Sequence, residues 1–327
     1  MIDPQEIQIA AERIVDHVIR TPLLHSKPLS ERHRALIYLK AEHRQRTGSF
    51  KVRGSANLVH ALSPKDAEAG VVTASTGNHG IGVATAAASR GITCQIFLPA
   101  NASPSKIADI HRLGAETTLI EATDSSFAEQ AARAFADERH LAYVSPYNDP
   151  LIIAGQGTIG KEILEQAQSA ELGAIDAVVV SVGGGGLISG IATWVKSHSP
   201  STRIIGASAL NDRAMAASVD VGRIMTPEFK PTFSDGTAGG LEAGTMTFDI
   251  CRDLVDEWID VSELEIAHAV RNLIDDHHQL VEGAAGVAIS AATAWADGNP
   301  ASTVVAVACG ANVSSETVGA MLRMSAG

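Results

Sequence analysis

The sequence is poor in aromatic residues, which make up 4% of its 327 residues, and it holds three cysteines. No run of 18 apolar residues occurs, so no segment is expected to cross a membrane. The first residues, "MIDPQEIQIAAERIVDHVIR", lack the basic and apolar segments of a signal peptide. Three widely spaced cysteines, Cys94, Cys251 and Cys309, fit a reducing compartment without structural disulfides. We therefore predict a soluble, cytoplasmic protein.

An excess of positive charge is also absent. The 25 Lys and Arg residues are outnumbered by 37 Asp and Glu residues, which gives a net charge of -12. Such a charge argues against nucleic acid or an anionic membrane as a partner. Apolar residues make up 45% of the chain, the ordinary share for a protein with a sizeable buried core.

Short apolar runs alternate with segments of helical length almost throughout the chain. The runs are continuous rather than alternating, as in strands of a parallel sheet that is covered by helices on both faces. Repeated units of this kind predict a doubly wound α/β fold. The predicted strands are 36–40, 70–75, 93–99, 116–121, 141–146, 177–183, 203–209 and 303–309. Helices are predicted at 124–138, 151–169, 263–276 and 312–325, among others.

The first candidate ligand loop is "SVGGGGLISG", in which Gly183, Gly184, Gly185 and Gly186 follow a strand and open a helix. Consecutive glycines cost backbone entropy, so we expect them to bring bare N–H groups close to an anion at the helix N-terminus. The alternative is a flexible turn. The loop has neither the glycine spacing of a dinucleotide site nor the Gly-Lys-Ser/Thr ending of a triphosphate site. It is therefore predicted to bind a single phosphate group.

The second candidate loop is "ASTGNHGIG" at 74–82, where Ser75, Thr76, Asn78 and His79 lie at another helix start. A helix N-terminus favours an anion, here a carboxylate, although Ser, Thr and Asn are also ordinary N-cap residues. Both interpretations stay open on the sequence. His79 is predicted to be a hydrogen-bonded loop histidine rather than a base.

Two further residues complete the pattern. Cys309 in "VACGANVS" ends the last predicted strand, where it is either a functional thiol or a small buried apolar residue. Lys51 in "RTGSFKVRGSAN" lies between an aromatic residue and a helix rich in small residues. A lysine, a phosphate loop and a carboxylate-binding turn are together what pyridoxal phosphate, an aldehyde with one phosphate, requires.

The motifs "GSFKVRGSAN", "STGNHG" and "SVGGGGLISG", in this order, resemble those of the fold-type II pyridoxal-phosphate enzymes, in particular the threonine/serine dehydratase and serine racemase group. The resemblance runs from "TPLLHS" to "CGANVS". It implies a tryptophan synthase β-like fold of two doubly wound parallel-sheet domains and a homodimer. The large domain would comprise 1–64 and 147–327, and the small domain 65–146 would contribute the carboxylate loop. "VEGAAG" and "STGNHG" look most like the dehydratases of hydroxyectoine breakdown.

The resemblance also implies roles for individual residues. Lys51 would be the Schiff-base lysine and catalytic base. The cofactor would further contact Phe50 at its ring, Asn78 at its phenolic oxygen, Cys309 at its pyridine nitrogen, and Gly183, Gly184, Gly185, Gly186 and Leu187 at its phosphate. The substrate carboxylate would be bound by Ser75, Thr76, Asn78 and His79, with Ser75 and Thr76 also counted among the catalytic residues.

Two departures from the group pattern bear on function. Ser208 and Ala209 replace a Glu-Pro pair, and Ala214 stands where a second acidic ligand is expected, so we predict no metal. Racemases of the group have Ser where this chain has Thr76, which disfavours racemisation.

The expected reaction is α,β-elimination of a β-hydroxy amino acid to a 2-keto acid and ammonia. Alternatives within the group are a dehydratase of hydroxyectoine catabolism acting on a hydroxylated diamino-acid derivative, a 3-hydroxyaspartate dehydratase and a serine racemase. Outside it, a nucleotide-binding dehydrogenase would need the missing glycine spacing, and a non-catalytic amino-acid sensor would not need Lys51. Threonine, serine, 3-hydroxyaspartate and N-acetylated hydroxy-diamino acids stay open as substrates.

Overall fold

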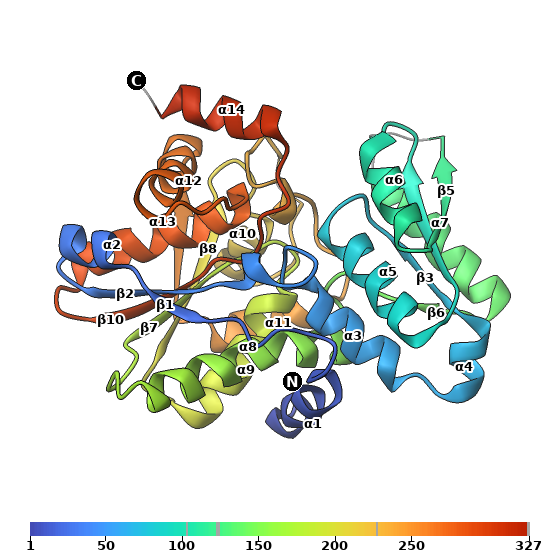
Figure 1. Cartoon of the computed structure of the whole chain (residues 1–327), viewed down its shortest axis with the longest axis horizontal. Coiled ribbons are helices and arrows are strands. Elements are labelled where there is room, and N and C mark those ends of the chain that lie inside the picture. Colours follow the sequence, from blue (N-terminus) through green and yellow to red (C-terminus); the bar gives the residue numbers. More distant parts are fainter. Residues whose placement is uncertain (103, 122–124, 227, 326–327) are drawn as a thin grey trace.

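Two separate sheets organise the chain in the computed structural model, which describes residues 1–102, 104–121, 125–226 and 228–325. One sheet has six strands and the other has four, and helix α3 lies between the two halves of the molecule (Figure 1). The strands are β1 (Leu23–His25), β2 (Leu36–Lys40), β3 (Val71–Ala74), β4 (Cys94–Pro99), β5 (Glu116–Ile120), β6 (Ala142–Tyr143), β7 (Ala177–Ser181), β8 (Arg203–Ala209), β9 (Glu257–Val261) and β10 (Thr303–Val307).

Helices make up most of the remaining regular structure. They are α1 (Pro4–Ile14), α2 (Lys27–His33), α3 (Lys51–Ala61), α4 (Pro64–Ala69), α5 (Asn78–Arg90), α6 (Pro104–Arg112), α7 (Ser125–Arg139), α8 (Pro150–Ser169), α9 (Gly186–His198), α10 (Ala214–Val221), α11 (Met246–Leu254), α12 (Glu263–His277), α13 (Gly283–Gly298) and α14 (Ser315–Met324). Short 3-10 turns lie at η1 (Glu42–Arg44) and η2 (Asp235–Thr237).

The six-stranded sheet has the order β1-β2-β10-β7-β8-β9 and is parallel except for β1, which pairs antiparallel with β2. Helices α12 and α13 cover one of its faces and α8 and α9 the other (Figure 1). Strands β7 and β10 are buried at every position because helices cover both faces of the sheet. Val178, Val179, Val304 and Val305, for example, are all fully buried.

The four-stranded sheet has the order β5-β4-β3-β6 and is parallel throughout. Successive residues of β3 point to opposite faces: Val71 packs with α5 residues such as Val83, and Val72 packs with α7 residues such as Ala132. We call this sheet with α5, α6 and α7 the four-stranded unit. The remainder that surrounds the larger sheet is called the six-stranded unit.

The predicted α/β fold and its doubly wound sheets are confirmed, and the eight predicted strands all occur, several of them shorter than expected. The strand predicted at 141–146 comprises only Ala142–Tyr143 in the structure. Two strands were missed: β1, which has only three residues, and β9, "EWIDV", whose charged residues hid it. The predicted helices correspond to α7, α8, α12 and α14, although residue 124 of the first lies outside the described residues.

Helices α3, α8 and α9 pack unusually closely because glycines face one another. A Cβ added at Gly155 of α8 would lie 2.6 Å from Gly54 Cα of α3. On the other side of α8, a Cβ added at Gly190 of α9 would lie 2.5 Å from the Gly157 nitrogen. Since a side chain at these places would collide with backbone, the position of α3 relative to α8 is fixed by backbone contact.

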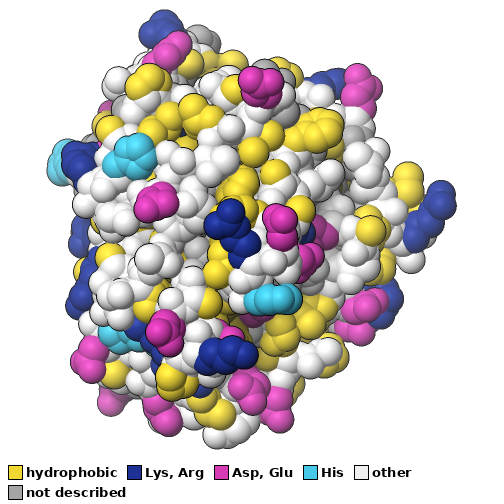
Figure 2. Space-filling model, turned by 90° about the vertical axis from the view of Figure 1, so that its right-hand side faces the viewer, with side chains coloured by type: hydrophobic (Ala, Val, Ile, Leu, Met, Phe, Trp, Pro, Cys, Tyr) yellow, Lys and Arg dark blue, Asp and Glu magenta, His cyan; other side chains and the backbone are white. Residues whose placement is uncertain are grey.

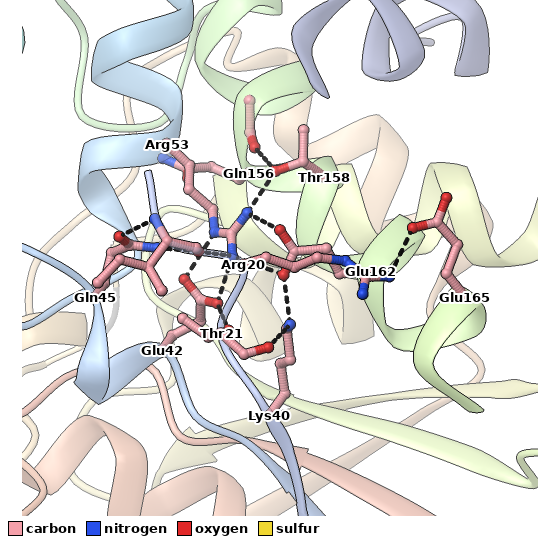
Figure 3. A network of polar contacts seen from close by, with 12 residues as sticks. Arg20, Thr21, Lys40, Glu42, Gln45, Arg53, Gln156, Thr158, Glu162 and Glu165 are labelled. Atoms are coloured by element: carbon pink, nitrogen blue, oxygen red, sulfur yellow. Dashed lines mark hydrogen bonds and ion pairs between the residues drawn. The ribbon is translucent and has the colours of Figure 1, made fainter. Parts of the chain in front are cut away.

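A buried ion network joins α3 to the six-stranded unit (Figure 3). Arg53 of α3 has no exposed side-chain surface, and it forms two hydrogen bonds of 2.8 Å with Glu42 of η1. Its guanidinium also donates to both carboxylate oxygens of Glu162 on α8, at 2.7 and 2.9 Å. Lys40, the last residue of β2, donates to Glu162 at 2.5 Å and to the Thr21 carbonyl at 2.7 Å.

The opposite charges of this network shift the pKa values of Arg53 and Glu42 toward their ionised forms. Burial alone would lower the pKa of the Arg53 guanidinium, but the carboxylates of Glu42 and Glu162 outweigh it and raise that pKa. Burial likewise opposes ionisation of Glu42, and Arg53 overcomes it, so the pKa of the Glu42 carboxyl is lowered. The Arg53 and Glu42 pair is therefore held in its charged form, and each of the two groups depends on its partner.

The surface carries charges of both signs. On the face in Figure 2, Lys and Arg side chains are interspersed with Asp and Glu side chains, in keeping with the acidic balance of the whole chain. Within the described part of the chain, every helix is too short or too polar to cross a lipid bilayer.

We predict that Arg53→Met lowers the free energy of unfolding by about 3–5 kcal/mol, because it leaves the buried Glu42 carboxylate without its cationic partner and Glu162 with Lys40 alone. Urea unfolding measures this quantity. The control is Arg203→Met, whose partner Glu257 lies 3.4 Å away and whose side chain is 48% exposed. That change should cost less than about 1 kcal/mol. Equal losses in both variants would contradict the assignment of a stabilising network.

Candidate active site

The candidate site lies where four loops from both units meet. Three of them follow the carboxyl ends of parallel strands β3, β7 and β10, the edge at which α/β sheets bind ligands. The fourth precedes α3 and carries Lys51.

Lys51 is the first residue of α3, and its surroundings are fixed by the end of β10. The Phe50 N–H donates to the Cys309 carbonyl at 3.1 Å, and Ser49 forms a β-bridge with Gly310. Lys51 Nζ donates to the Pro146 carbonyl at 2.8 Å and lies 5.3 Å from the centre of the Phe50 ring. The structure thus brings Phe50, Lys51 and Cys309 together, as predicted from the sequence.

The surroundings of Lys51 lower the pKa of its amine. Desolvation by burial lowers its pKa to about 8, while Cys309, Glu282 and Glu129 act in the opposite direction. An amine with a pKa near neutral pH has an available lone pair for attack on a carbonyl or for removal of a proton.

The glycine loop forms the floor of the site beside Tyr147. Gly185 has φ +84°, a left-handed conformation that suits glycine, and it caps the start of α9. A Cβ at Gly184 would lie 2.3 Å from the Tyr147 ring, and one at Gly183 would lie 2.6 Å from the Thr237 carbonyl. The following Leu187 packs in the core of the six-stranded unit. Only bare backbone fits in this loop, which leaves its N–H groups at the helix start for an anion.

Asn78 and His79 begin α5 in the four-stranded unit. His79 Nε2 donates to the Val144 carbonyl at 3.0 Å, which agrees with the prediction of a hydrogen-bonded histidine. Burial and the nearby Lys51 lower the pKa of His79 to about 3, so the ring is neutral. Its Nδ1 is buried without a hydrogen-bond partner among the described residues.

Ser75 and Thr76 are half-buried in the turn before α5. Ser75 Oγ accepts from the Gly77 N–H at 3.1 Å. A Cβ at Gly80 would lie 2.4 Å from the Ser75 carbonyl, so the first turn of the helix folds tightly against the loop. The loop therefore faces the site with hydroxyls and helix N–H groups, a setting that suits a carboxylate.

Glu282 is a site residue that the sequence interpretation missed. Asn78 Nδ2 donates to both of its carboxylate oxygens at 3.0 Å, and the Asn312 N–H donates at 3.2 Å. Cys309 Sγ donates to Glu282 Oε1 at 3.8 Å and accepts from Ser181 Oγ at 3.6 Å. Glu282 thus ties Asn78 of the four-stranded unit to the thiol and loop at the end of β10.

Burial raises the pKa of the Glu282 carboxyl to about 7, with Asp235 acting in the same direction and Asn78 against it. Burial also raises the pKa of the Cys309 thiol, which is therefore neutral. A signal for Glu282 was present in "VEGAAG", because a lone acidic residue separates an apolar position from an apolar helix.

Ser208, Ala209 and Ala214 replace the residues of the group's cation site, and Asp212 lies beside them, in a β-bridge with Ala209. Asp212 Oδ2 accepts from the Gly239 N–H at 2.7 Å, and Ser208 and Ala214 are buried. Among the described residues, no group of three His, Cys, Asp or Glu side chains is arranged to hold a metal ion.

A half-buried lysine between a glycine loop and an asparagine-containing helix start fits the site of an α/β pyridoxal-phosphate enzyme. The family model described as "Pyridoxal-phosphate dependent enzyme" matches residues 14–310, and the chain belongs to this family. It is therefore pyridoxal-phosphate dependent.

Named relatives and solved structures agree with this membership. The chain is 42% identical over 291 residues to the L-threonine ammonia-lyase of Thermotoga maritima, covering 89% of this chain and 71% of the relative. It is 38% identical to the catabolic L-threonine dehydratase TdcB of Escherichia coli, over 86% of this chain and 84% of that one. Processed threonine deaminase isoform 2 of Solanum lycopersicum superposes with a TM-score of 0.91 at 33% identity, covering 99% and 89% of the two chains. Maize serine racemase gives 0.89 at 31%, covering 98% and 97%.

The side chains of the site fit the cofactor. Lys51 supplies a buried amine, and the glycine loop excludes every Cβ from a helix N-terminus. The neutral Cys309 thiol and the Asn78 amide are the polar groups that the resemblance assigns to the cofactor ring.

We predict that Glu282→Gln changes the pH dependence of stability. The pKa of about 7 keeps a proton on Glu282 of the folded protein up to about pH 7, whereas the unfolded chain releases it near the ordinary glutamate pKa of 4.5. The wild type therefore loses stability through this group as pH rises from about 5 to 7, by up to about 1.4 kcal/mol per pH unit.

Urea unfolding of both proteins at pH 5, 6, 7 and 8 tests this. The free energy of Glu282→Gln minus that of the wild type should rise between pH 5 and 7 and be level above. A difference that is constant with pH would show that Glu282 ionises normally.

Proposed function

We propose that the protein is a pyridoxal-phosphate-dependent dehydratase, an ammonia-lyase that converts L-threonine or L-serine to a 2-keto acid and ammonia. The observation that carries the proposal is the buried Lys51 amine, with a pKa of about 8, held between the Pro146 carbonyl, Phe50 and the end of β10. The names of the relatives, L-threonine ammonia-lyase and L-threonine dehydratase, support this reaction class.

In this proposal the residues around Lys51 hold the cofactor. Lys51 Nζ would bind its aldehyde carbon, and Phe50 would pack beside its ring. The phosphate would be bound by Gly183, Gly184, Gly185, Gly186 and Leu187. Asn78 and Cys309 would contact the polar edge of the ring, and Glu282 behind them orients both. Bound pyridoxal phosphate supplies an electron sink for the charge that develops at the substrate α-carbon.

The chain itself supplies binding and proton transfer. Ser75, Thr76 and the N–H groups at the start of α5 bind the substrate carboxylate, so the amino group is directed toward Lys51. His79, neutral and bonded to Val144, supports this loop. The neutral Lys51 amine then accepts the α-proton. Loss of the β-hydroxyl as water, followed by hydrolysis, releases the keto acid and ammonia.

Elimination is favoured over racemisation by two features. Racemisation needs a second base on the face opposite Lys51, and this chain offers the Thr76 hydroxyl there rather than a serine. The neutral Cys309 thiol is too weak an acid to keep a pyridine nitrogen protonated, and a neutral ring favours rapid departure of the leaving group.

The remaining proposals concern organisation. Residues 1–64 and 147–327 would form the large domain and 65–146 the small one; β3, β4, β5 and β6, the strands of the smaller sheet, all fall within 65–146. Cys94, Cys251 and Cys309 are free and buried, which supports a cytoplasmic location. A homodimer is proposed from the family resemblance.

We predict that Lys51→Ala folds but has no turnover. The visible absorbance of the covalently bound cofactor, near ~410–420 nm for an imine of pyridoxal phosphate, should also be absent. Borohydride treatment followed by peptide mass spectrometry should find the phosphopyridoxyl group on the Lys51 peptide of the wild type alone. Lys27→Ala, which removes a surface lysine paired with Glu31, is the control and should keep both properties. An adduct on another lysine in Lys51→Ala would overturn the assignment.

We also predict that chelation leaves activity nearly unchanged. Ser208 and Ala214 occupy the positions at which related enzymes have acidic ligands, and the Asp212 carboxylate already accepts a backbone hydrogen bond. Keto-acid release from serine should stay within about twofold after EDTA treatment and dialysis. Loss of activity that magnesium restores would contradict this prediction.

A further inference from the structure

Residues 238–245, between η2 and α11, form a loop that is held by the Gly239 N–H donating to Asp212, by Leu241 packing against the core, and by the side chain of Glu242. Gly239 has φ +130° and Gly244 has φ +71°, and a Cβ at either position would meet open space. Most residues of the loop are exposed, whereas the side chain of Glu242 is only 20% exposed. The positive φ angles at Gly239 and Gly244 suit glycine, and Glu242 is the residue of this loop whose side chain reaches the four-stranded unit.

Glu242 uses all of its polar groups at this anchor. Arg133 Nη2 lies 2.6 Å from Oε1, and Asn148 Nδ2 donates to Oε2 at 2.9 Å. The Glu242 N–H donates to the Tyr147 hydroxyl at 2.8 Å. Asn148 Oδ1 in turn accepts from the Met246 N–H at 3.1 Å, which fixes the far end of the loop.

Arg133 belongs to the opposite side of the site. It lies on α7 of the four-stranded unit, and its guanidinium carbon is 4.2 Å from the centre of the Tyr143 ring. The Arg133–Glu242 pair therefore connects the four-stranded unit to a loop of the six-stranded unit. Asn78 and Glu282 make a second such connection near Lys51.

The loop reaches the reacting lysine through two adjacent residues. Tyr147, which accepts from Glu242, has its ring against Gly184 and its Cβ and backbone against Gly186. The preceding residue, Pro146, accepts the hydrogen bond from Lys51 Nζ. If Glu242 moves, the Tyr147 hydroxyl loses the hydrogen bond from the Glu242 N–H, and this hydrogen bond helps to hold the Tyr147 ring on the glycine loop.

An ordinary surface ion pair is the simpler interpretation, since the Arg133 side chain is 41% exposed and such pairs contribute little to stability. It does not account for the three partners of Glu242, for the flanking glycines or for the connection across the two units. A hydrogen-bonded pair with these features is suited to holding a movable loop in one position.

We propose that Glu242 and Arg133 form a clamp that holds the loop 238–245 closed over the cofactor site during turnover. Both are positioning residues, since they act on the site through Tyr147 and Asn148. The proposal rests on the dehydratase function only in its kinetic test.

The kinetic test compares Arg133→Gln, Glu242→Gln and the double variant in the holoenzyme with L-serine and L-threonine. Each single change should lower kcat/KM about tenfold, equal to about 1.4 kcal/mol, with kcat and KM both altered. Because the residues act as one clamp, the double variant should lose about the same tenfold rather than about a hundredfold. Arg133→Lys should recover part of the loss.

Arg203→Gln, which breaks an exposed ion pair far from the loop, is the control and should keep wild-type kinetics. Urea unfolding of every variant separates a general loss of stability from the effect on kcat/KM. Multiplicative losses in the double variant, or unchanged kinetics in the single variants, would overturn the clamp.

A second measurement needs no turnover. A protease specific for Glu should cleave after Glu242 only when the loop opens, and the exposed Glu171 serves as an internal standard. In holoenzyme carrying Arg133→Gln, cleavage at Glu242 relative to Glu171 should rise at least about fivefold over the wild type. An unchanged ratio would overturn the proposal even if the enzyme is a dehydratase. An increased ratio in a protein inactive on both substrates would retain the clamp and reject the proposed function.

Discussion

The buried ion network around Arg53 is the interaction on which the site depends. Arg53 lies two residues after Lys51 on α3, and its guanidinium is held by Glu42 before the helix and Glu162 on α8. Because these charges are removed from water, each partner tolerates only a narrow geometry. The start of α3, and with it the Lys51 amine, is consequently fixed by electrostatics on one side and by the glycine contacts with α8 on the other.

The other residues of the site come from two different units of the molecule. Cys309 and Glu282 belong to the same unit as the network and adjoin buried strand β10. Asn78, His79 and the Ser75–Thr76 turn belong to the four-stranded unit, which contacts the first group through Asn78 and Glu282. In the proposed function, the substrate would therefore bind between the six-stranded unit, which carries the Lys51 amine, and the four-stranded unit, which carries the loop proposed for its carboxylate.

Much of this could be predicted from the sequence because the relevant signals are local. The apolar runs of β7, β8 and β10, the glycine loop and the lysine after Phe50 are each contiguous, so α/β order and the main site residues followed directly. Strand β9 was missed because its sequence, "EWIDV", has two charged residues among five and is not the continuous apolar run of the inner strands. Glu282 and Glu242 were missed because their roles arise from contacts with residues 204 and 109 positions away, Asn78 and Arg133. The lone acidic residue of "VEGAAG" marks Glu282 as unusual, but the sequence does not show which distant residue it contacts.

The glycine contact between α3 and α8 has a consequence for how this enzyme can change. Gly54 and Gly155 approach so closely that a larger residue at either position would have to displace a backbone that also carries the catalytic amine. Inherited variation in this half is thus confined to substitutions that preserve its geometry. Substitutions that change substrate specificity are therefore expected in the four-stranded unit and in the loop 238–245, where side chains can be replaced without moving Lys51. For laboratory evolution, libraries directed at those segments would keep the chemistry while exploring the pocket.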